Sequence, residues 1–325
     1  MRRGVSTSSD ALGDSVDYEE IPPEFQDEHS KYPAMRIRTP GGEWHKVNVI
    51  DTRHEIRAPG GFRIRVPLLD SSGIYFTSQC IKEYVNHRRN CNILMTGDPG
   101  HGKSTLISHC ALEVDPNFSV NQVAFWLRDF EEIFKLNPYG DGEKGIYPQV
   151  NMDESAHAMY GPEYMKEEQR VLAKNMIISR RKRNIVWFAT PKRKLLNPHV
   201  REMVNIWIHV TEPKPFLPGY ARVRFAPPEK QSEFHAEKFW EPKYAFIFPE
   251  MTGPFWEQYE EKKIAFMEEA SVKKVASEAE DVLKIVVKNL RARGMSQAEI
   301  GKVIERNQST VSRAEARSSF EATPK

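Results

Sequence analysis

An eight-residue segment rich in glycine constrains the fold of this chain more than any other feature. It matches the pattern GxxxxGK[ST] and reads Gly97-Asp98-Pro99-Gly100-His101-Gly102-Lys103-Ser104. A short apolar run with the length of a buried strand, 91–96, precedes it, and helical spacing begins at Lys103. A strand, a glycine turn and a helix in this order predict a phosphate-binding loop, because glycines let backbone N–H groups turn toward a phosphate.

The residues of this loop would contribute different parts of phosphate binding. The new helix presents its positive end, Lys103 can reach the β- and γ-phosphates of a nucleotide, and the Ser104 hydroxyl can hold Mg²⁺. His101 fills a variable position of the pattern. We therefore predict that a nucleotide contacts the whole loop, namely Gly97, Asp98, Pro99, Gly100, His101, Gly102, Lys103, Ser104 and Thr105.

Two adjacent carboxylates, Asp153 and Glu154, close the β-type run 147–152. We expect Asp153 to complete the Mg²⁺ site with Ser104. We expect Glu154 to orient or deprotonate the attacking water, the general-base role that NTP hydrolysis requires. Pro148 and Asn151 weaken the run as an apolar strand, and an acidic helix N-terminus is the alternative interpretation of the pair.

The remaining pattern predicts an α/β fold. Apolar β-type runs at 123–127, 147–152, 185–189 and 206–210 alternate with helical stretches such as 129–136 and 163–183. Such alternation predicts a mainly parallel central sheet covered on both faces. Upstream, short alternating runs within 35–66 predict β-hairpins, and 221–225 and 243–248 predict a β-ribbon that extends the main domain.

These patterns give a domain organisation with five parts. We predict a disordered tail at 1–33, a small β element at 34–74, a nucleotide-binding domain with its β extension at 75–252, a linker helix at 253–276 and a helical domain at 277–325. No run approaches the roughly 18 apolar residues of a membrane helix. The polar N-terminus lacks the apolar core of a signal peptide, so we expect a cytoplasmic protein. Cys80, Cys91 and Cys110 have no metal-site spacing and are expected to be buried thiols.

The net charge of +2 conceals an uneven distribution along the chain. Eleven Lys and Arg residues lie between Lys166 and Arg201. Such a cluster can attract a polyanion, but it is equally typical of a solvated helix face. The charge pattern alone leaves both interpretations open.

The C-terminal segment 295–313 resembles a helix-turn-helix of the repressor and sigma-factor type. Gly294 breaks the preceding helix, and Ser296 with Glu299 forms a capping box for the next one. We expect Ile300, Val303, Ile304 and Val311 to pack against Val282, Ile285 and Val286. The resemblance implies that the second helix enters a major groove of double-stranded DNA, with contacts from Gln308, Ser309, Thr310, Ser312 and Arg313. An oligomerisation bundle of the same size is the alternative.

With the loop and the acidic pair together, residues 75–212 resemble the P-loop ATPases in which a catalytic Glu follows the Walker B Asp. The resemblance implies ATP and Mg²⁺ as ligands, which the lack of a guanine-reading NKxD motif supports. It places the inserted central strand at 185–189 and a γ-phosphate sensor at Thr190, which would act in catalysis with Lys103 and Glu154. Ring-forming members also use a basic residue that reaches a neighbouring subunit's nucleotide. Arg201 is our first candidate for this finger, with Arg180, Arg181 and Arg183 as rivals.

Within this group, the basic run 180–183 before the strand 184–190 resembles the FtsK/HerA branch of DNA-pumping ATPases. This implies a homo-oligomeric ring, such as a hexamer, that translocates, packages or remodels double-stranded DNA. That branch commonly carries Gln at the sensor position, whereas Thr190 is closer to AAA+ usage. An AAA+ loader or transposition ATPase therefore stays open, as does a regulator in which nucleotide binding merely switches DNA binding.

Overall fold

A computed structural model describes residues 18–20, 31–57, 63–153, 179–196, 198–211, 219–225 and 242–304. The chain divides into two compact units, Met1–Glu257 and Gln258–Lys325, which are described separately. Several predicted features lie outside the described residues. They are Glu154, most of the helix expected at 163–183, and the expected DNA contacts Gln308, Ser309, Thr310, Ser312 and Arg313.

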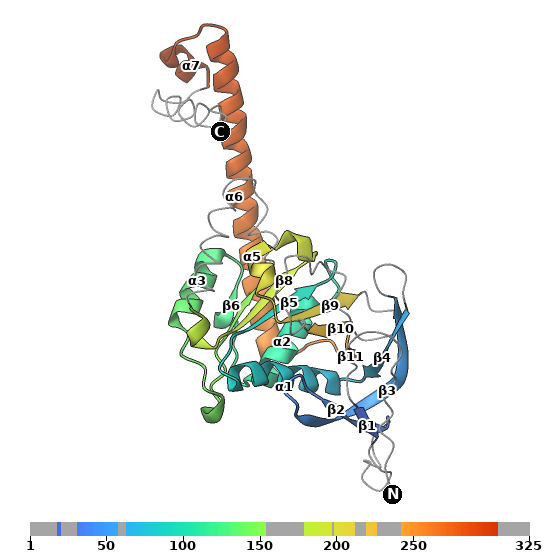
Figure 1. Cartoon of the computed structure of the whole chain (residues 1–325). Coiled ribbons are helices and arrows are strands. Elements are labelled where there is room, and N and C mark those ends of the chain that lie inside the picture. The colour runs from blue at the N-terminus through green and yellow to red at the C-terminus, as the bar shows by residue number, and fades with distance from the viewer. Residues whose placement is uncertain are drawn as a thin grey trace, which may run out of the picture. The chain divides into compact units, whose positions relative to one another are not determined.

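The described part of the first unit is built on one mixed sheet (Figure 1). The order across it is β1-β2-β3-β4-β11-β10-β9-β5-β8-β7-β6, and the five strands from β9 to β6 are parallel. The prediction of an α/β fold with a mainly parallel central sheet is confirmed. The strands are β1 Tyr18–Glu20, β2 Ala34–Arg38, β3 Trp44–Arg57, β4 Arg63–Leu69, β5 Cys91–Thr96, β6 Val123–Ala124, β7 Gln149–Met152, β8 Ile185–Thr190, β9 Ile206–Thr211, β10 Gly219–Phe225 and β11 Tyr244–Phe248.

Helices cover both faces of the parallel strands. The described helices of this unit are α1 Ser72–Asn86, α2 Lys103–Val114, α3 Leu127–Leu136, α5 Pro198–Glu202 and the start of α6, Pro254–Ala292. On one face, Phe188 of β8 packs in a buried cluster with Phe130 of α3 and Val200 of α5. Its neighbour Trp187 points to the other face and donates a hydrogen bond to Gln149, whose amide donates to the Ala111 carbonyl of α2. The alternation of side chains along β8 therefore separates the two helical layers.

Several element boundaries differ from what the sequence pattern indicates. Helix α1 begins at Ser72, although helical spacing is evident only from Ser78. Strand β6 ends at Ala124 because Leu127 already begins α3, the amphipathic helix expected from 129. Residues Ser179–Lys182, at the end of the helix expected at 163–183, form a 3₁₀ turn, and Arg183 after them takes a positive φ of 56°. The left-handed backbone at Arg183 cannot continue an α-helix.

The N-terminal hairpins belong to the same sheet as β5, the strand that precedes the phosphate loop. Strand β4 pairs in parallel with β11, and β11 pairs antiparallel with β10. The strands within 34–69 and the predicted β-ribbon are thus neighbours. All three cysteines, Cys80, Cys91 and Cys110, are buried and free, as expected. Burial raises the pKa of the Cys110 thiol above its usual range, so the thiol stays protonated.

Glu83 ties α1 to the turn between β2 and β3. Its carboxylate accepts hydrogen bonds from the Thr39 hydroxyl and, at 2.9 Å, from the Gly41 backbone N–H. Only 5% of Glu83 is exposed. Because both bonds are made to a buried charged group, they hold the hairpin against the helix.

Truncating this carboxylate is expected to destabilise the protein. Glu83→Ala leaves the Thr39 hydroxyl and the Gly41 N–H without their acceptor, so we expect the free energy of unfolding to fall by about 1–3 kcal/mol. Urea unfolding of the full chain measures this change. The exposed Glu113 of α2 provides the control, since Glu113→Ala should change stability by less than about 0.5 kcal/mol. Equal effects of the two substitutions would contradict the linking role of Glu83.

The described part of the second unit contains most of α6 and the helix α7, Gln297–Val303. Ser296 and Glu299 form the predicted capping box at the start of α7. The core of this unit confirms the predicted packing for Ile300 and Ile304 and corrects it for Ile285 and Val303, while Val311 lies outside the described residues. Val287 and Ile300 are buried, with Leu283, Leu290, Met295 and Ile304 against them, whereas Ile285 is 60% and Val303 is 59% exposed. None of the described helices is long and apolar enough to cross a membrane.

Candidate nucleotide-binding site

The glycine-rich loop lies between the carboxyl end of β5 and the start of α2. Residues 98–100 are exposed, and Gly100 and Gly102 have positive φ angles of 82° and 83°. A Cβ at Gly100 would meet no atom within 4 Å, so its backbone is open to a ligand. At Gly97, by contrast, a Cβ would lie 2.4 Å from the Val210 carbonyl oxygen of β9. The loop therefore packs against the sheet at one end and exposes its backbone in the middle, as a phosphate cradle requires.

The Lys103 ammonium lies within this loop. Its Nζ donates hydrogen bonds to the carbonyl oxygens of Gly97 at 2.9 Å and Asp98 at 3.0 Å. Only 8% of Lys103 is exposed. The charge is thus held against the backbone of Gly97 and Asp98, where it complements an anion in the loop.

Ser104 and Asp153 are brought together as the sequence suggests. The Ser104 hydroxyl, at the start of α2, donates a 2.7 Å hydrogen bond to Asp153 Oδ2, directly after β7. Asp153 is 1% exposed, and its backbone N–H donates to the Ala124 carbonyl oxygen of β6. A hydroxyl and a carboxylate are the hard oxygen ligands that Mg²⁺ prefers. The donor set therefore fits a nucleotide-bound Mg²⁺ at the carboxyl ends of parallel strands.

Thr190 and Arg201, which were also predicted to act in catalysis, lie near opposite ends of the parallel strands. Thr190 ends β8 in register with Thr96, the residue before the loop, and its hydroxyl donates to the Lys192 carbonyl at 3.3 Å. Arg201 lies on α5, two residues before Met203, whose carbonyl accepts a hydrogen bond from Asn92 near the amino end of β5. Thr190 is thus beside the phosphate loop of its own chain, whereas Arg201 is placed toward the opposite end of β5.

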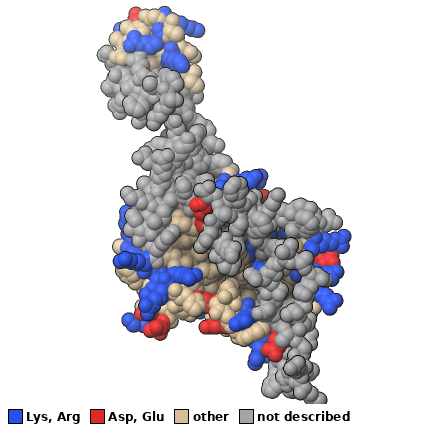
Figure 2. Space-filling view, viewed as in Figure 1, with Lys and Arg blue, Asp and Glu red and all other residues tan. Residues whose placement is uncertain are grey.

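The described rivals of Arg201 also lie at the amino ends of the parallel strands. Arg181 is exposed within the 3₁₀ turn that precedes β8, and Arg183 donates to the Gly140 carbonyl at 3.2 Å. Their neighbour Lys182 donates to three backbone carbonyls at the end of α3, Phe134, Lys135 and Asn137. Residues 181–183 of the predicted cluster thus precede β8, whereas Lys192, Arg193 and Lys194 follow its carboxyl end. Figure 2 shows the Lys and Arg side chains in several distinct groups.

A hydrogen-bonded group beside the loop was not predicted from the sequence. The Trp207 indole N–H of β9 donates to Thr96 Oγ1 at 2.8 Å, and Thr96 Oγ1 lies 2.9 Å from His209 Nδ1. With the indole donating to this hydroxyl, its own hydrogen can be donated to a neutral His209 ring. Burial, followed by the charges of Arg222 and Arg224, lowers the His209 pKa to about 4. The ring is therefore neutral at pH 7, and in the tautomer protonated at Nε2 its Nδ1 accepts this hydrogen bond.

Arginines of the next strand enlarge this group. Arg224 of β10 is 5% exposed, and its guanidinium carbon lies 4.6 Å from the centroid of the Trp207 ring. Burial, together with the charge of Arg222, lowers the Arg224 pKa to about 10, so the side chain stays cationic at pH 7. His101, a variable position of the loop pattern, also contributes to the lowered pKa of His209. The positively charged side chains of Arg222 and Arg224 thus lie near the phosphate loop.

His209 predicts an acid-sensitive stability. In an unfolded chain a histidine has a pKa near 6.5, above its folded value of about 4, so below about pH 6.5 the unfolded chain binds more protons. We expect the contribution of this residue to make the folded state less stable as the pH falls from about 6.5 to about 4. Comparing urea unfolding of the wild type and His209→Gln across this range isolates the contribution. Parallel pH profiles for the two proteins would contradict it.

The sequence did contain a signal for this group. Trp207 and His209 are two residues apart on β9, and Arg222 and Arg224 are two residues apart on β10, so each pair shares one face of its strand. The antiparallel register places Arg222 opposite His209 and Arg224 opposite Trp207. Two adjacent strands with polar residues at alternate positions indicate a polar face, but their register is needed to bring the residues together.

Comparisons with known proteins add little beyond the geometry. No protein-family model matches the chain, and no curated protein matches it in sequence at a significant level. Solved structures that match include a KaiC-like protein from the hyperthermophilic archaeon Pyrococcus horikoshii OT3. That match has 13% sequence identity and a TM-score of 0.31, and it covers 50% of this chain and 91% of the other.

Proposed function

We propose that this protein binds ATP with Mg²⁺ and hydrolyses it. The observation that carries the proposal is the 2.7 Å contact between Ser104 Oγ and Asp153 Oδ2, beside a loop that encloses the Lys103 ammonium. These residues come from separate parts of the chain and meet at the carboxyl ends of parallel strands. A structural turn would need neither the buried ammonium nor a carboxylate aimed at the first turn of α2.

The residues of the chain have distinct roles in this reaction. The loop backbone and Lys103 bind and orient the phosphates, and Ser104 and Asp153 hold Mg²⁺, which neutralises charge on the phosphates when bound. Glu154, the next residue in the sequence, takes a proton from the attacking water. Thr190, whose hydroxyl donates to the Lys192 carbonyl in this structure, turns this donor toward the γ-phosphate when ATP binds. Arg201 acts in a neighbouring subunit's site, which is consistent with its place away from its own loop.

We further propose that hydrolysis drives a ring-forming motor on double-stranded DNA. Support comes from the second unit, where the capping box of Ser296 and Glu299 begins a short helix packed through Ile300. This is the first helix of the helix-turn-helix that the sequence resembles. The contacts to base edges and phosphates then come from the residues that follow, Gln308, Ser309, Thr310, Ser312 and Arg313.

ATP hydrolysis with and without linear duplex DNA tests this proposal in the full-length protein. We expect turnover that duplex DNA stimulates, together with ATP-dependent displacement of a third strand from triplex DNA. Stimulated turnover without displacement would favour an AAA+-type loader or transposition ATPase. ATP-dependent DNA binding without turnover would overturn the motor in favour of a nucleotide-switched regulator.

A further inference from the structure

A short basic turn projects from the sheet next to the phosphate loop. It consists of Lys192, Arg193 and Lys194, and we call it the basic turn. The Thr190 hydroxyl donates to the carbonyl of Lys192 at the start of the turn, and Leu196, which is 1% exposed, anchors the chain in the core after it. The side chains of Lys192 and Lys194 are exposed. A turn fixed at both ends thus holds two ammonium groups in solvent.

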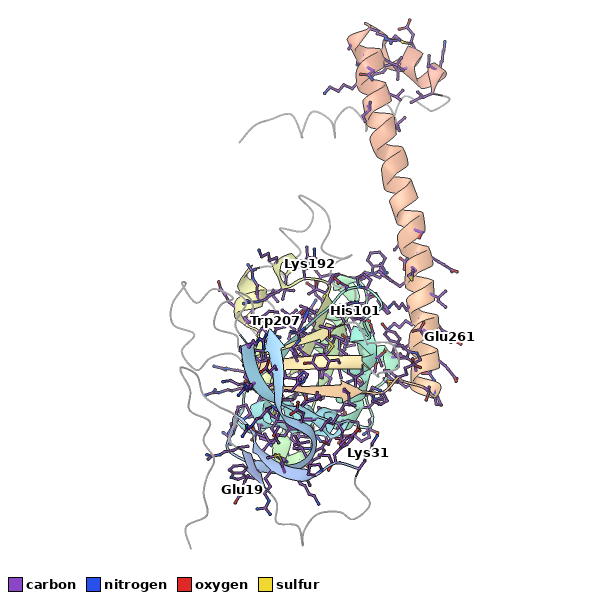
Figure 3. All side chains as sticks on the ribbon, turned by 90° about the vertical axis from the view of Figure 1, so that its right-hand side faces the viewer. Glu19, Lys31, His101, Lys192, Trp207 and Glu261 are labelled. Carbon is purple, nitrogen blue, oxygen red and sulfur yellow. The ribbon has the colours of Figure 1, made fainter. Side chains whose placement is uncertain are left out.

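The middle residue of the basic turn points back toward the sheet. The guanidinium carbon of Arg193 lies 5.3 Å from the centroid of the Trp207 ring, within the range of a cation–π contact. The same ring lies 4.6 Å from the guanidinium carbon of Arg224. Two arginines from different segments therefore contact one indole ring. Figure 3 shows Lys192, Trp207 and His101 toward the same end of this unit.

Trp207 connects the basic turn with the phosphate loop. Its Nε1–H donates to Thr96 Oγ1 at 2.8 Å, and Thr96 is bonded covalently to Gly97, the first residue of the loop. A second connection runs through the Thr190 hydroxyl to the backbone of Lys192. Displacing the basic turn would therefore disturb hydrogen bonds at Thr190 and at Thr96, the residue before the phosphate loop.

We propose that the basic turn binds the phosphate backbone of duplex DNA and that Trp207 transmits this contact to the phosphate loop through Thr96. The inference rests on the proposed function, because it explains how DNA stimulates the ATPase. Lysine ammonium groups bind phosphates as mobile point charges, which suits contact with a backbone independently of its sequence. Arg193 lies between the two lysines and contacts the Trp207 ring, so a shift of the turn on binding DNA would act on this ring. Trp207 is a positioning residue in this arrangement.

Two variants separate the DNA contact from its transmission. Lys192→Ala/Lys194→Ala removes both exposed charges, so we expect weaker DNA binding. We also expect the slope of log Kd against log salt concentration to fall by about two. Trp207→Phe keeps an aromatic ring for the two arginines but removes the N–H that Thr96 accepts. We expect Trp207→Phe to bind duplex DNA as the wild type does, while its ratio of DNA-stimulated to basal ATPase rate falls about fivefold or more.

The matched control is Lys135→Ala/Lys144→Ala. These lysines are 70% and 74% exposed, and they lie at the end of α3 and in the turn before β7, away from the phosphate loop. The charge removed is the same, so we expect wild-type DNA affinity and stimulation. Tryptophan fluorescence supplies a further signature, since DNA should change the emission of the wild type and change that of Trp207→Phe less.

The outcomes distinguish this inference from the proposed function. Linear duplex DNA is the probe, and thermal unfolding verifies that each variant is folded. A stimulated wild type together with full stimulation of Trp207→Phe overturns the transmission through Trp207. Wild-type affinity and salt dependence in the double lysine variant overturn the DNA contact. A wild type that DNA does not stimulate overturns the proposed motor itself and this inference with it.

Discussion

Replacing Glu154 by Gln is expected to lower the turnover of ATP by about 10²- to 10⁴-fold while ATP binding persists. Glutamine keeps the size of the side chain but cannot accept a proton from water. Asp153, the preceding residue, still accepts the hydrogen bond from the Ser104 hydroxyl and can still hold Mg²⁺. The substitution should therefore separate binding from chemistry.

Steady-state phosphate release and equilibrium binding of a fluorescent ATP analogue measure the two properties of Glu154→Gln. The exposed Glu113 supplies the control, and Glu113→Gln should retain wild-type values for both. If turnover by Glu154→Gln stays within a few-fold of the wild type, another group activates the water. If binding disappears together with turnover, Glu154 acts in nucleotide binding rather than as a base.

Gly97→Ala is expected to disrupt the phosphate loop. The added Cβ would lie 2.4 Å from the Val210 carbonyl oxygen and 3.2 Å from its carbon. That carbonyl belongs to β9, which pairs with β5 on one side and β10 on the other and cannot easily move away. The loop has to shift instead, so we expect a loss of about 1–3 kcal/mol in unfolding free energy and at least a tenfold loss of ATP affinity.

Gly145→Ala is the matched control for this prediction. Gly145 has a positive φ of 68°, and a Cβ there would meet no atom within 4 Å. The control therefore reports backbone strain of about 1–2 kcal/mol without a clash and away from the loop. Urea unfolding and titration with an ATP analogue compare the two variants. ATP affinity of Gly97→Ala equal to that of Gly145→Ala would show that the close approach to Val210 does not support nucleotide binding.

The central strands were the most predictable part of this fold. Residues 91–96 form β5 with the expected bounds, and 185–189 lies within β8, because continuous apolar runs suit strands buried on both faces. The start of α3 was less predictable, since Phe125, Trp126 and Leu127 continue the apolar run past the end of β6. Local patterns do not show where a buried strand gives way to an amphipathic helix.

Contacts between distant segments explain most of what the sequence could not reveal. The phosphate-loop pattern identified Ser104, and the acidic pair after the run 147–152 identified Asp153, because each residue belongs to a local motif. The position of Trp207 between Arg193 and Arg224 depends on the register of β9 with β10 and on the path of a turn. In the second unit, the helical phase decided that Val287 rather than Ile285 is buried.

The place of β11 in the sheet has a consequence for how this protein is made. Strand β4 pairs with β11 through Leu68 and Ala245, so during translation β4 is finished long before its partner exists. At about 5–20 residues per second, the interval is on the order of ten seconds. Pairing between strands so distant in sequence is also intrinsically slow. The nascent N-terminal hairpins therefore present an open edge to the ribosome surface and to chaperones until the segment containing β11 has emerged.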